Sequence, residues 1–462
     1  MKPLDVRTIK RLLKAELIYG PVNWKVQHVI YYKRHDLTRT HTMMFIHRNE
    51  TVNWNEIRSK APVLLITDKP ADQMKKDIPD VTVLQVPSLV QAYWTFIDYY
   101  RGLFSIPVVT ITGTCGKTTT KDMIRHIMSA KYHVVASISS KNEPRRSFPY
   151  LMQMDEQTDV AVFEHGLGNS GNIKHQCMIY KPTIGILTNI GVHHLDGCND
   201  LDGYIRAKGE IVEGISKGGT LILNKDDENT KKVGLSSFQG NKIIYISIQE
   251  EADYQATDIR YAEGGMSFTL IHAGDSYKAF VPGYGTHQVY NALAAIAATT
   301  EMGLAERDAI YQLATFSNPE RHMQFFEGVS GSTIIDDTWT INPTSIKAAL
   351  QVVKELGKEK KIIFVVGDIN RLGRFEKKYH REIGDLIAEQ PIDLLITIGS
   401  KAEEIGRQAK RAGSQAEIRM LKQVEGVEKI VAPLLDQNTI VLIKGPMSSK
   451  GLIEFAKGLR KK

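Results

Sequence analysis

The chain has 462 residues, 42% of them hydrophobic, and its 59 Lys and Arg residues against 52 Asp and Glu give a net charge of +7. This length exceeds what one hydrophobic core supports, so we expect two or three globular domains. The small, unfocused positive charge argues against a nucleic-acid-binding protein, the lack of apolar runs of roughly 20 residues argues against a membrane protein, and three cysteines without metal-ligand spacing argue against a disulfide or zinc scaffold.

Residues 1–104 are expected to form a small α/β domain. The first 20 residues lack the compact apolar stretch of a secretory signal, so we expect a soluble, cytoplasmic protein. Further along, "WKVQHVIYYK" and "PVLLITD" predict strands, and "SLVQAYWTFIDYYRGL" predicts a helix. This part of the chain carries no motif that indicates a chemistry.

Residues 105–317 are expected to form a central domain with a mostly parallel sheet. Apolar, β-branched runs alternate with helical patterns, and strands that are apolar on both faces are typical of a parallel sheet covered by helices on each side. The segment "MSFTLIHAGDSYKAFVPG" predicts a hairpin, and the alanine-rich "QVYNALAAIAATTEMGL" predicts a helix. The runs that predict parallel strands are "PVVTITG", "DVAVFEHG", "TIGILTNIG", "GTLILNKDD" and "KIIYISI".

Residues 318–462 begin a new alternation of strands and helices. The strands are expected in "STIIDDTW", "KKIIFVVGD", "IDLLITIGS" and "TIVLIKG". This pattern is typical of a doubly wound, Rossmann-like domain. The predicted fold is therefore α/β with three domains, in which the central one has a P-loop-type sheet.

A phosphate-binding loop is predicted between the strand at 108–111 and the helix that follows. Backbone N–H groups of such a turn and the positive end of the helix dipole hold phosphate oxygens. Lys117 would contact the β- and γ-phosphates, and the Thr118 hydroxyl would bind Mg²⁺. The alternative is an ordinary glycine turn with a solvent-facing lysine. The residues of this nucleotide site are Gly113, Thr114, Cys115, Gly116, Lys117, Thr118 and Thr119.

Further polar residues follow in an order that favours a catalytic site. Glu164 ends a predicted strand, and the carboxyl ends of strands are where ligands bind in open α/β sheets. Each residue alone has an ordinary explanation, such as a helix cap, a loop histidine or a solvated lysine. The other candidates are His193, His194, Lys208, His287, Asn291, Arg321 and Asp337.

Together these motifs resemble the Mur ligase superfamily, whose nucleotide loop is a Gly-Thr-x-Gly-Lys-Thr-Thr variant. Cys115 occupies the variable position of that loop. The resemblance covers residues 108–320, and "IIDDTWTINP" with "LIKG" extends it to the carboxyl-terminal domain. The chain is most similar to the branch that adds D-alanyl-D-alanine.

The resemblance implies a role for each candidate residue. Thr118 and Glu164 would hold one Mg²⁺, while His194 and a carbamylated Lys208 would hold a second. A carbamate suits this place because it supplies the anionic oxygen that Mg²⁺ prefers, whereas an ammonium is repelled. Residues expected to contact ATP are Asn291 with His287 at the adenine, Asp337 at the ribose and Arg321 at the phosphates. The expected catalytic residues are Lys117, His194, Lys208 and Arg321.

The activity implied by the resemblance is ADP-forming amide synthesis through an acyl phosphate. A carboxylate donor would bind to the domain of residues 1–104. One possible donor is a UDP-linked muropeptide. The acceptor would be an amino acid or a dipeptide. We expect a monomer with no nucleic-acid or membrane partner.

Several positions depart from the family pattern and leave alternatives open. The Asp-Ser-Arg-like and Asp-Gly-His-like stretches that the family uses for the uridine nucleotide are missing from residues 1–104. Arg371 stands where this branch has a glutamate, and Pro446-Met447 replace a Ser-Arg pair. One alternative is therefore a ligase of the same family with a different carboxylate donor, and another is a non-catalytic ATP-binding regulator.

Overall fold

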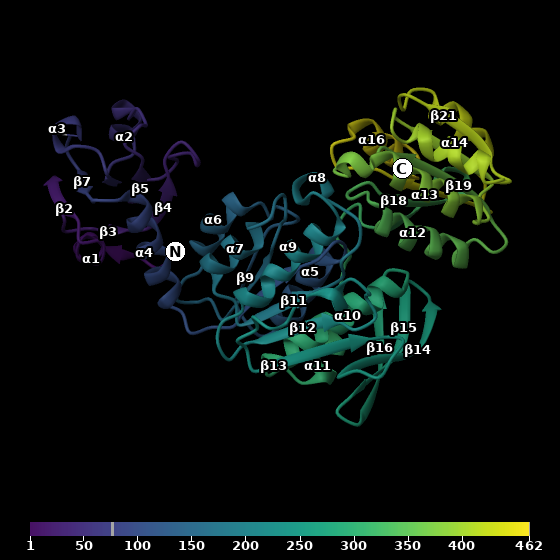
Figure 1. The fold of residues 1–462 in the computed structure, drawn as a ribbon, viewed down its shortest axis with the longest axis horizontal. Helices are drawn as coiled ribbons and strands as arrows, with labels where there is room; N and C mark the ends of the chain where they lie inside the picture. Colours follow the sequence, from purple (N-terminus) through teal and green to yellow (C-terminus); the bar gives the residue numbers. More distant parts are fainter. Residues whose placement is uncertain (75–77, 462) are drawn as a thin grey trace.

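The computed structural model describes residues 1–74 and 78–461, which fold around three large sheets of five, nine and six strands (Figure 1). The sheets follow one another along the sequence. Figure 1 shows the amino-terminal sheet at one end of the molecule and the carboxyl-terminal sheet at the other, with the central sheet between them. Within the described ranges, none of the helices combines the length and apolar character needed to cross a bilayer.

The amino-terminal sheet has the strand order β2-β7-β6-β5-β4, in which β2 and β7 are antiparallel and the other pairs are parallel. Helices α1 and α4 cover one face, and α2 and α3 cover the other. A separate two-stranded ladder joins β1 (Leu4–Asp5) to β3 (Lys25–Val26). The bounds are α1 (Val6–Leu12), β2 (Glu16–Tyr19), β4 (His28–Tyr31), β5 (Thr42–Ile46), α2 (Trp54–Ser59), β6 (Val63–Thr67), α3 (Ala71–Met74), β7 (Val81–Gln85) and α4 (Leu89–Gly102).

The sequence predicted only part of this sheet. The strands expected in "WKVQHVIYYK" and "PVLLITD" and the helix α4 are confirmed, whereas β2, β5 and β7 were missed. Along β5, Met43 and Phe45 face one core while Met44 and Ile46 face the other. Since every residue of β5 is buried, the strand shows no apolar–polar alternation, and five apolar residues do not by themselves distinguish a strand from a helix.

The central sheet has the order β16-β15-β14-β13-β12-β11-β8-β10-β9 and is parallel from β9 to β14. Helices α5, α10 and α11 pack on one face, and α7 and α9 on the other. The strands are β8 (Val108–Thr112), β9 (Val134–Ala136), β10 (Val160–Glu164), β11 (Ile184–Leu187), β12 (Thr220–Asn224), β13 (Lys242–Ser247), β14 (Tyr254–Ala262), β15 (Gly265–His272) and β16 (Asp275–Pro282). The helices are α5 (Lys117–Ser129), α6 (Ser147–Leu151), α7 (Asn172–Tyr180), α8 (Leu195–Cys198), α9 (Leu201–Gly214), α10 (Thr286–Glu301) and α11 (Glu306–Leu313).

The predicted strands, the hairpin β15–β16 and the helices α5 and α10 of this region are confirmed. Strands β9 and β14 were missed. In β14 the core-facing residues are Tyr254, Ala256, Ile259 and Tyr261, and a bulge between Thr257 and Arg260 interrupts their alternation with the exposed Asp258 and Arg260. The hydrophobic signal of a strand is weak in such a pattern.

The carboxyl-terminal sheet has the order β17-β18-β22-β19-β20-β21, with β17 antiparallel to its neighbour and the other pairs parallel. Helices cover both of its faces, which confirms the doubly wound architecture. The elements are β17 (Gln324–Glu327), β18 (Thr333–Asp337), α12 (Pro343–Leu356), β19 (Lys361–Gly367), α13 (Glu376–Ala388), β20 (Leu394–Ile398), α14 (Glu403–Arg411), β21 (Glu417–Leu421), α15 (Val427–Val431), β22 (Thr439–Lys444) and α16 (Lys450–Gly458).

We propose domain boundaries at 104/105 and 317/318, since each large sheet lies within one of the three ranges 1–104, 105–317 and 318–462. The domains are not independent, because their hydrophobic cores are shared. One core cluster includes Phe96 of α4 together with Phe163 of β10 and Tyr180 of α7. Another joins Leu195 of the central domain to Leu372 of the carboxyl-terminal domain.

Candidate active site

A cavity of about 950 Å³ lies where the central sheet meets the carboxyl-terminal domain. The carboxyl ends of β10 and β12 reach its wall with Glu164 and Asn224, and the loops after β8 and β11 reach it as well. The carboxyl-terminal domain contributes residues such as Asp337, Trp339 and Arg371. This volume is at the upper end of the range for small-molecule sites and suits a nucleotide together with a second substrate.

The predicted phosphate loop forms the turn between β8 and α5. Gly116 precedes the first residue of α5 and has φ +83°, and an added Cβ there would lie 2.2 Å from Asn291 Oδ1. At Gly113, which has φ +143°, a Cβ would lie 2.0 Å from Thr188 Oγ1. The Cys115 amide donates to Asn189 Oδ1 over 3.1 Å, which holds the loop against the end of β11. Both glycines are therefore required by the conformation and by the close approach of Asn291 on α10 and of Thr188 directly after β11.

Lys117 is the first residue of α5 and lines the cavity. Its Nζ donates to the carbonyl oxygen of Thr114 over 3.0 Å and so curls over the loop. Thr118 and Thr119 follow in the first helical turn, and both line the cavity. A lysine over a loop at a helix amino terminus is an arrangement that binds phosphate groups.

Oxygen ligands suited to Mg²⁺ gather beside this loop. Thr118 Oγ1 donates to Glu164 Oε2 over 2.8 Å, and Asn142 Nδ2 donates to Glu164 Oε1 over 2.5 Å. The described residues contain no group of three or more His, Cys, Asp or Glu side chains placed to hold a metal ion. One carboxylate and one hydroxyl fit Mg²⁺ nonetheless, because this ion commonly takes one or two protein ligands and completes its shell with phosphate oxygens and water.

Lys208 lies on α9 and is 1% exposed, with its Nζ donating to Thr112 Oγ1 over 3.1 Å. Burial lowers the pKa of Lys208 well below its usual value, and the positive charge of Lys117 lowers it further. The amine is therefore more readily neutral than a surface lysine. Because carbon dioxide reacts with neutral amines, this environment suits the predicted carbamylation.

His194 and His193 stand at the same end of the cavity, with their ring centroids 4.1 Å apart. Burial, followed by the charge of Lys208, lowers the pKa of His194 to about 4. Its Nδ1 atom is buried and has no hydrogen-bond partner among residues 1–74 and 78–461. A neutral imidazole with a free ring nitrogen is the form that binds a metal ion.

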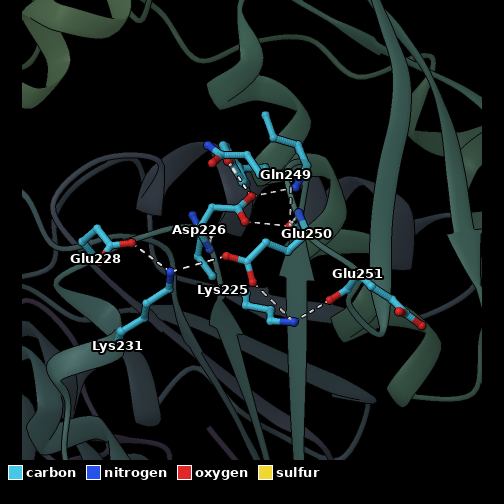
Figure 2. Close-up of polar contacts among 11 residues, drawn as sticks. Lys225, Asp226, Glu228, Lys231, Gln249, Glu250 and Glu251 are labelled. Carbon is cyan, nitrogen blue, oxygen red and sulfur yellow. Dashed lines mark hydrogen bonds and ion pairs between the residues drawn. The ribbon is translucent and has the colours of Figure 1, made fainter.

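The structure also identifies a carboxylate whose role the sequence did not suggest. Asp226, two residues after β12, accepts hydrogen bonds from Ser247 Oγ over 2.6 Å and from Tyr290 OH over 2.7 Å, and it lines the cavity. Figure 2 shows the carboxylate of Glu250 below Asp226, between Lys225 and Lys231 and paired with both. Asp226 thus ties the loop after β13 to α10 and shapes this wall of the cavity.

The residues expected to contact adenine lie on α10. Asn291 Nδ2 donates to Gln288 Oε1 over 3.1 Å, and Thr120 Oγ1 of α5 donates to Asn291 Oδ1 over 3.4 Å. His287 lies one helical turn earlier in the cavity wall, and burial lowers its pKa to about 4. Both side chains are therefore neutral groups near the phosphate loop.

The carboxyl-terminal domain reaches the expected metal ligand Thr118 through Trp339 and Ser140. Trp339 Nε1 donates to Ser140 Oγ over 2.9 Å, and Ser140 Oγ lies 2.7 Å from Thr118 Oγ1. Asp337, at the end of β18, also lines the cavity and is ion-paired with the buried Lys444. Sequence reasoning missed Ser140, because its importance depends on a contact with a residue 199 positions later.

The structure differs from expectation most at Arg321. This residue has a left-handed φ of 59°, and its guanidinium stacks 4.4 Å from the ring centroid of Trp339. It is not among the residues that line the cavity, whereas Trp339 is. The other predicted residues converge on the cavity wall, apart from Gly113, which lies at the base of the loop.

Comparisons with known proteins agree with this geometry. A family model described as the Mur ligase middle domain matches residues 111–299, and one described as the Mur ligase, glutamate ligase domain matches residues 321–447. A relative from Bacillus subtilis, named UDP-N-acetylmuramoyl-tripeptide--D-alanyl-D-alanine ligase, is 29% identical over 385 residues, which are 82% of this chain and 81% of the relative.

Two solved structures share the fold. MurF from Acinetobacter baumannii superposes with a TM-score of 0.84 at 23% identity, covering 99% of both chains. The MurF ligase from Thermotoga maritima, solved in complex with ADP, has a TM-score of 0.77 at 20% identity and covers 93% of this chain and 97% of that one. The similarity in fold therefore includes the amino-terminal domain.

Proposed function

Since the chain belongs to the Mur ligase family, we propose that it is an ATP-dependent ligase that forms an amide bond through an acyl phosphate. The donor is UDP-N-acetylmuramoyl-tripeptide and the acceptor is D-alanyl-D-alanine, as in the name of the Bacillus subtilis relative. This reaction belongs to the synthesis of a peptidoglycan precursor. The observation that supports it most directly is the convergence of Lys117, Glu164 and Lys208 on one cavity.

In the first step an oxygen of the donor carboxylate attacks the γ-phosphorus of ATP, and the bond to the ADP oxygen breaks. The helix amino terminus and Lys117 hold the β- and γ-phosphates in line for this transfer. Asn291 and His287 lie where they can contact the adenine, and Asp337 where it can contact the ribose.

Two metal sites fit the residues present, one at Thr118 and Glu164 and one at His194 and Lys208 in its carbamate form. Bound Mg²⁺ offsets negative charge on the transferring phosphoryl group. In the second step the acceptor amine attacks the carbonyl carbon of the acyl phosphate. The amine loses a proton, the carbon–oxygen bond to phosphate breaks, and the amide and inorganic phosphate result.

We propose that Arg321 stabilises the phosphates indirectly, through its stacking on Trp339. Its guanidinium would contact the phosphates directly only after a rotation of the Trp339 ring. Replacement by alanine is expected to lower kcat by about 10²- to 10³-fold if the guanidinium acts on the phosphoryl group. An effect below threefold would restrict Arg321 to packing against Trp339.

The test is an assay of ADP and phosphate release by the purified protein. We expect release that requires both UDP-N-acetylmuramoyl-tripeptide and D-alanyl-D-alanine, with the pentapeptide product detected by mass spectrometry. ADP formation with neither substrate, or with another carboxylate alone, would contradict this assignment of donor and acceptor.

A second candidate keeps the ligase chemistry and changes the donor. It is favoured by the absence from residues 1–104 of the two stretches that the family uses for the uridine nucleotide. A titration with UDP separates the two candidates, because a uridine-specific domain binds UDP in competition with the donor. Activity that is insensitive to millimolar UDP would favour the second candidate.

We further propose a cytoplasmic monomer without nucleic-acid or membrane partners. The small, unfocused net charge of +7 supports the absence of a nucleic-acid partner. Size-exclusion chromatography with light scattering at working concentration is expected to give the mass of one 51.8 kDa chain.

A further inference from the structure

The cavity wall contains two lysines and one arginine, which are Lys117, Lys208 and Arg371. Lys117 curls over the phosphate loop, and Lys208 is buried against Thr112 beside the expected metal ligands. Among the described residues of this wall, Arg371 is the cationic residue to which we have assigned no part in binding the nucleotide or the metal ions.

Arg371 lies at the reacting end of the cavity. Its carbonyl oxygen accepts a hydrogen bond of 2.8 Å from the amide of Leu195, the residue that follows His194. Arg371 therefore lies beside His194, which is proposed to hold the second metal ion, and approaches it from the carboxyl-terminal domain.

The guanidinium is oriented but not saturated. Its Nη1 donates to Asp196 Oδ2 over 3.1 Å, and 61% of the side chain is exposed. Among residues 1–74 and 78–461, no further hydrogen bond is formed by its other nitrogen atoms. An arginine has five N–H donors in a fixed plane, so the remaining donors can bind a carboxylate in a bidentate manner.

The proposed acceptor, D-alanyl-D-alanine, ends in a carboxylate whose distance from the reacting amine suits a contact with Arg371. In an extended dipeptide the terminal carboxylate lies roughly 7 Å from the amine, given about 3.5 Å per residue. The amine must reach the acyl phosphate beside Lys117 and His194, so its carboxylate points toward the surrounding wall. In the proposed arrangement the nucleotide is held by α5, by α10 and by Asp337 at its ribose, which leaves the part of the wall around Arg371 for the acceptor.

We propose that Arg371, oriented by Asp196, binds the carboxylate of the acceptor and makes the enzyme specific for acceptors with a free carboxyl terminus. This inference rests on the proposed ligase function and goes beyond it by naming the group that recognises the acceptor. Asp196 is a positioning residue in this arrangement, since it contacts the guanidinium and not the substrate.

The experiment compares D-alanyl-D-alanine with its carboxyl-terminal amide as acceptors for the wild type and for three variants. The wild type is expected to prefer the acid in kcat/KM by at least tenfold. Arg371→Ala is expected to raise the KM for the acid by about 10- to 100-fold and to abolish the preference, with the KM values for ATP and donor within twofold of wild type.

The other two variants separate recognition from a structural link between domains. Arg371→Lys keeps the charge without the planar fork and should recover part of the preference. Asp196→Ala breaks the same ion pair but leaves the guanidinium, so it should retain most of the preference. Circular dichroism and thermal melting establish that each variant is folded.

Two results would overturn the inference while leaving the ligase function in place. One is a wild type that uses the acid and the amide equally well, and the other is an Arg371→Ala variant that keeps the wild-type preference. Equal losses in Arg371→Ala and Asp196→Ala would assign Arg371 to a domain contact only. A wild type without activity toward either acceptor would instead count against the proposed function.

Discussion

At the scale of single residues, burial determines the chemistry of the site. Lys208 has a lowered pKa because it is surrounded by protein and close to Lys117. Such a group costs stability, since the unfolded chain can take up a proton that the folded chain resists. A lysine in this buried place is therefore explained by a function, such as the proposed metal site, rather than by stability.

Lys208→Met is expected to abolish ligation and to stabilise the protein at pH 7. The folded pKa of Lys208 lies below its unfolded value, so the unfolded state binds more protons between these two values, and wild-type stability rises with pH in that window. The Lys208→Met variant has no titratable group at this position, so its stability lacks this dependence on pH. Thermal melts between pH 7 and pH 10 in bicarbonate-free buffer measure the difference, which should shrink as the pH rises.

The carbamate has its own test. Wild-type protein freed of dissolved carbon dioxide is expected to lose most of its activity and to regain it when bicarbonate is added. The regained activity should be absent in Lys208→Met. Activity that is independent of bicarbonate would show that the free amine suffices.

Glu164→Gln is expected to reduce kcat by at least about 10²-fold and to raise the Mg²⁺ concentration needed for half-maximal rate. The amide can keep the hydrogen bond from Thr118, so the fold should be unaffected. ADP release measured across a Mg²⁺ series checks both effects. An unchanged Mg²⁺ dependence would remove Glu164 from the metal site.

At the scale of elements, the turn between β8 and α5 shows how backbone conformation creates a binding site. Gly116→Ala is expected to weaken ATP binding severely and to cost about 1–3 kcal/mol of unfolding free energy, because a Cβ with φ +83° would collide with Asn291. Gly264 provides the matched control, since it has φ +76° and no atoms within 4 Å of an added Cβ.

Urea unfolding and a titration with ADP separate the two costs. Gly264→Ala should show the backbone cost alone and bind ADP normally. If Gly116→Ala also binds ADP with wild-type affinity, the loop does not hold the nucleotide.

The sequence predicted this region well because several independent signals coincide there. A strand, a Gly-Lys-Thr turn and a helix follow one another within twenty residues, and Glu164 ends the neighbouring strand of the same sheet. The amino-terminal sheet gave weaker signals, since β5 is buried on both faces. The stacking of Arg321 on Trp339 and the contact of Ser140 with Trp339 arise from packing between distant segments, which a single sequence does not encode locally.

At the scale of the whole molecule, the carboxyl-terminal domain meets the central domain through apolar contacts, such as those of Leu195 and Leu372, and through polar contacts at the cavity. Thr344 Oγ1 accepts a hydrogen bond of 3.2 Å from the amide of Val192, and Trp339 contacts Ser140. A binding cavity bounded by two domains is typical of enzymes whose domains open and close around a substrate.

We therefore expect the domains to be more open without nucleotide and to adopt the present arrangement with it. Small-angle scattering should show a smaller radius of gyration on addition of a non-hydrolysable ATP analogue. Trp339→Phe, which keeps the ring but lacks the N–H donor to Ser140, should close less completely and lose about tenfold in kcat. A radius of gyration that does not change with nucleotide would argue against closure.

The amino-terminal domain also shares a hydrophobic core with the central domain, and buried hydrogen bonds connect the two. Tyr100 of α4 donates through its hydroxyl to the carbonyl oxygen of Met154 over 2.6 Å, and Arg101 donates to the carbonyl oxygen of Tyr180 over 2.6 Å. A chimera that exchanged residues 1–104 for those of a relative would cut through this shared interior. Engineers who wish to graft a new donor preference onto the enzyme should therefore transplant the matching surfaces of α6 and α7 along with the domain.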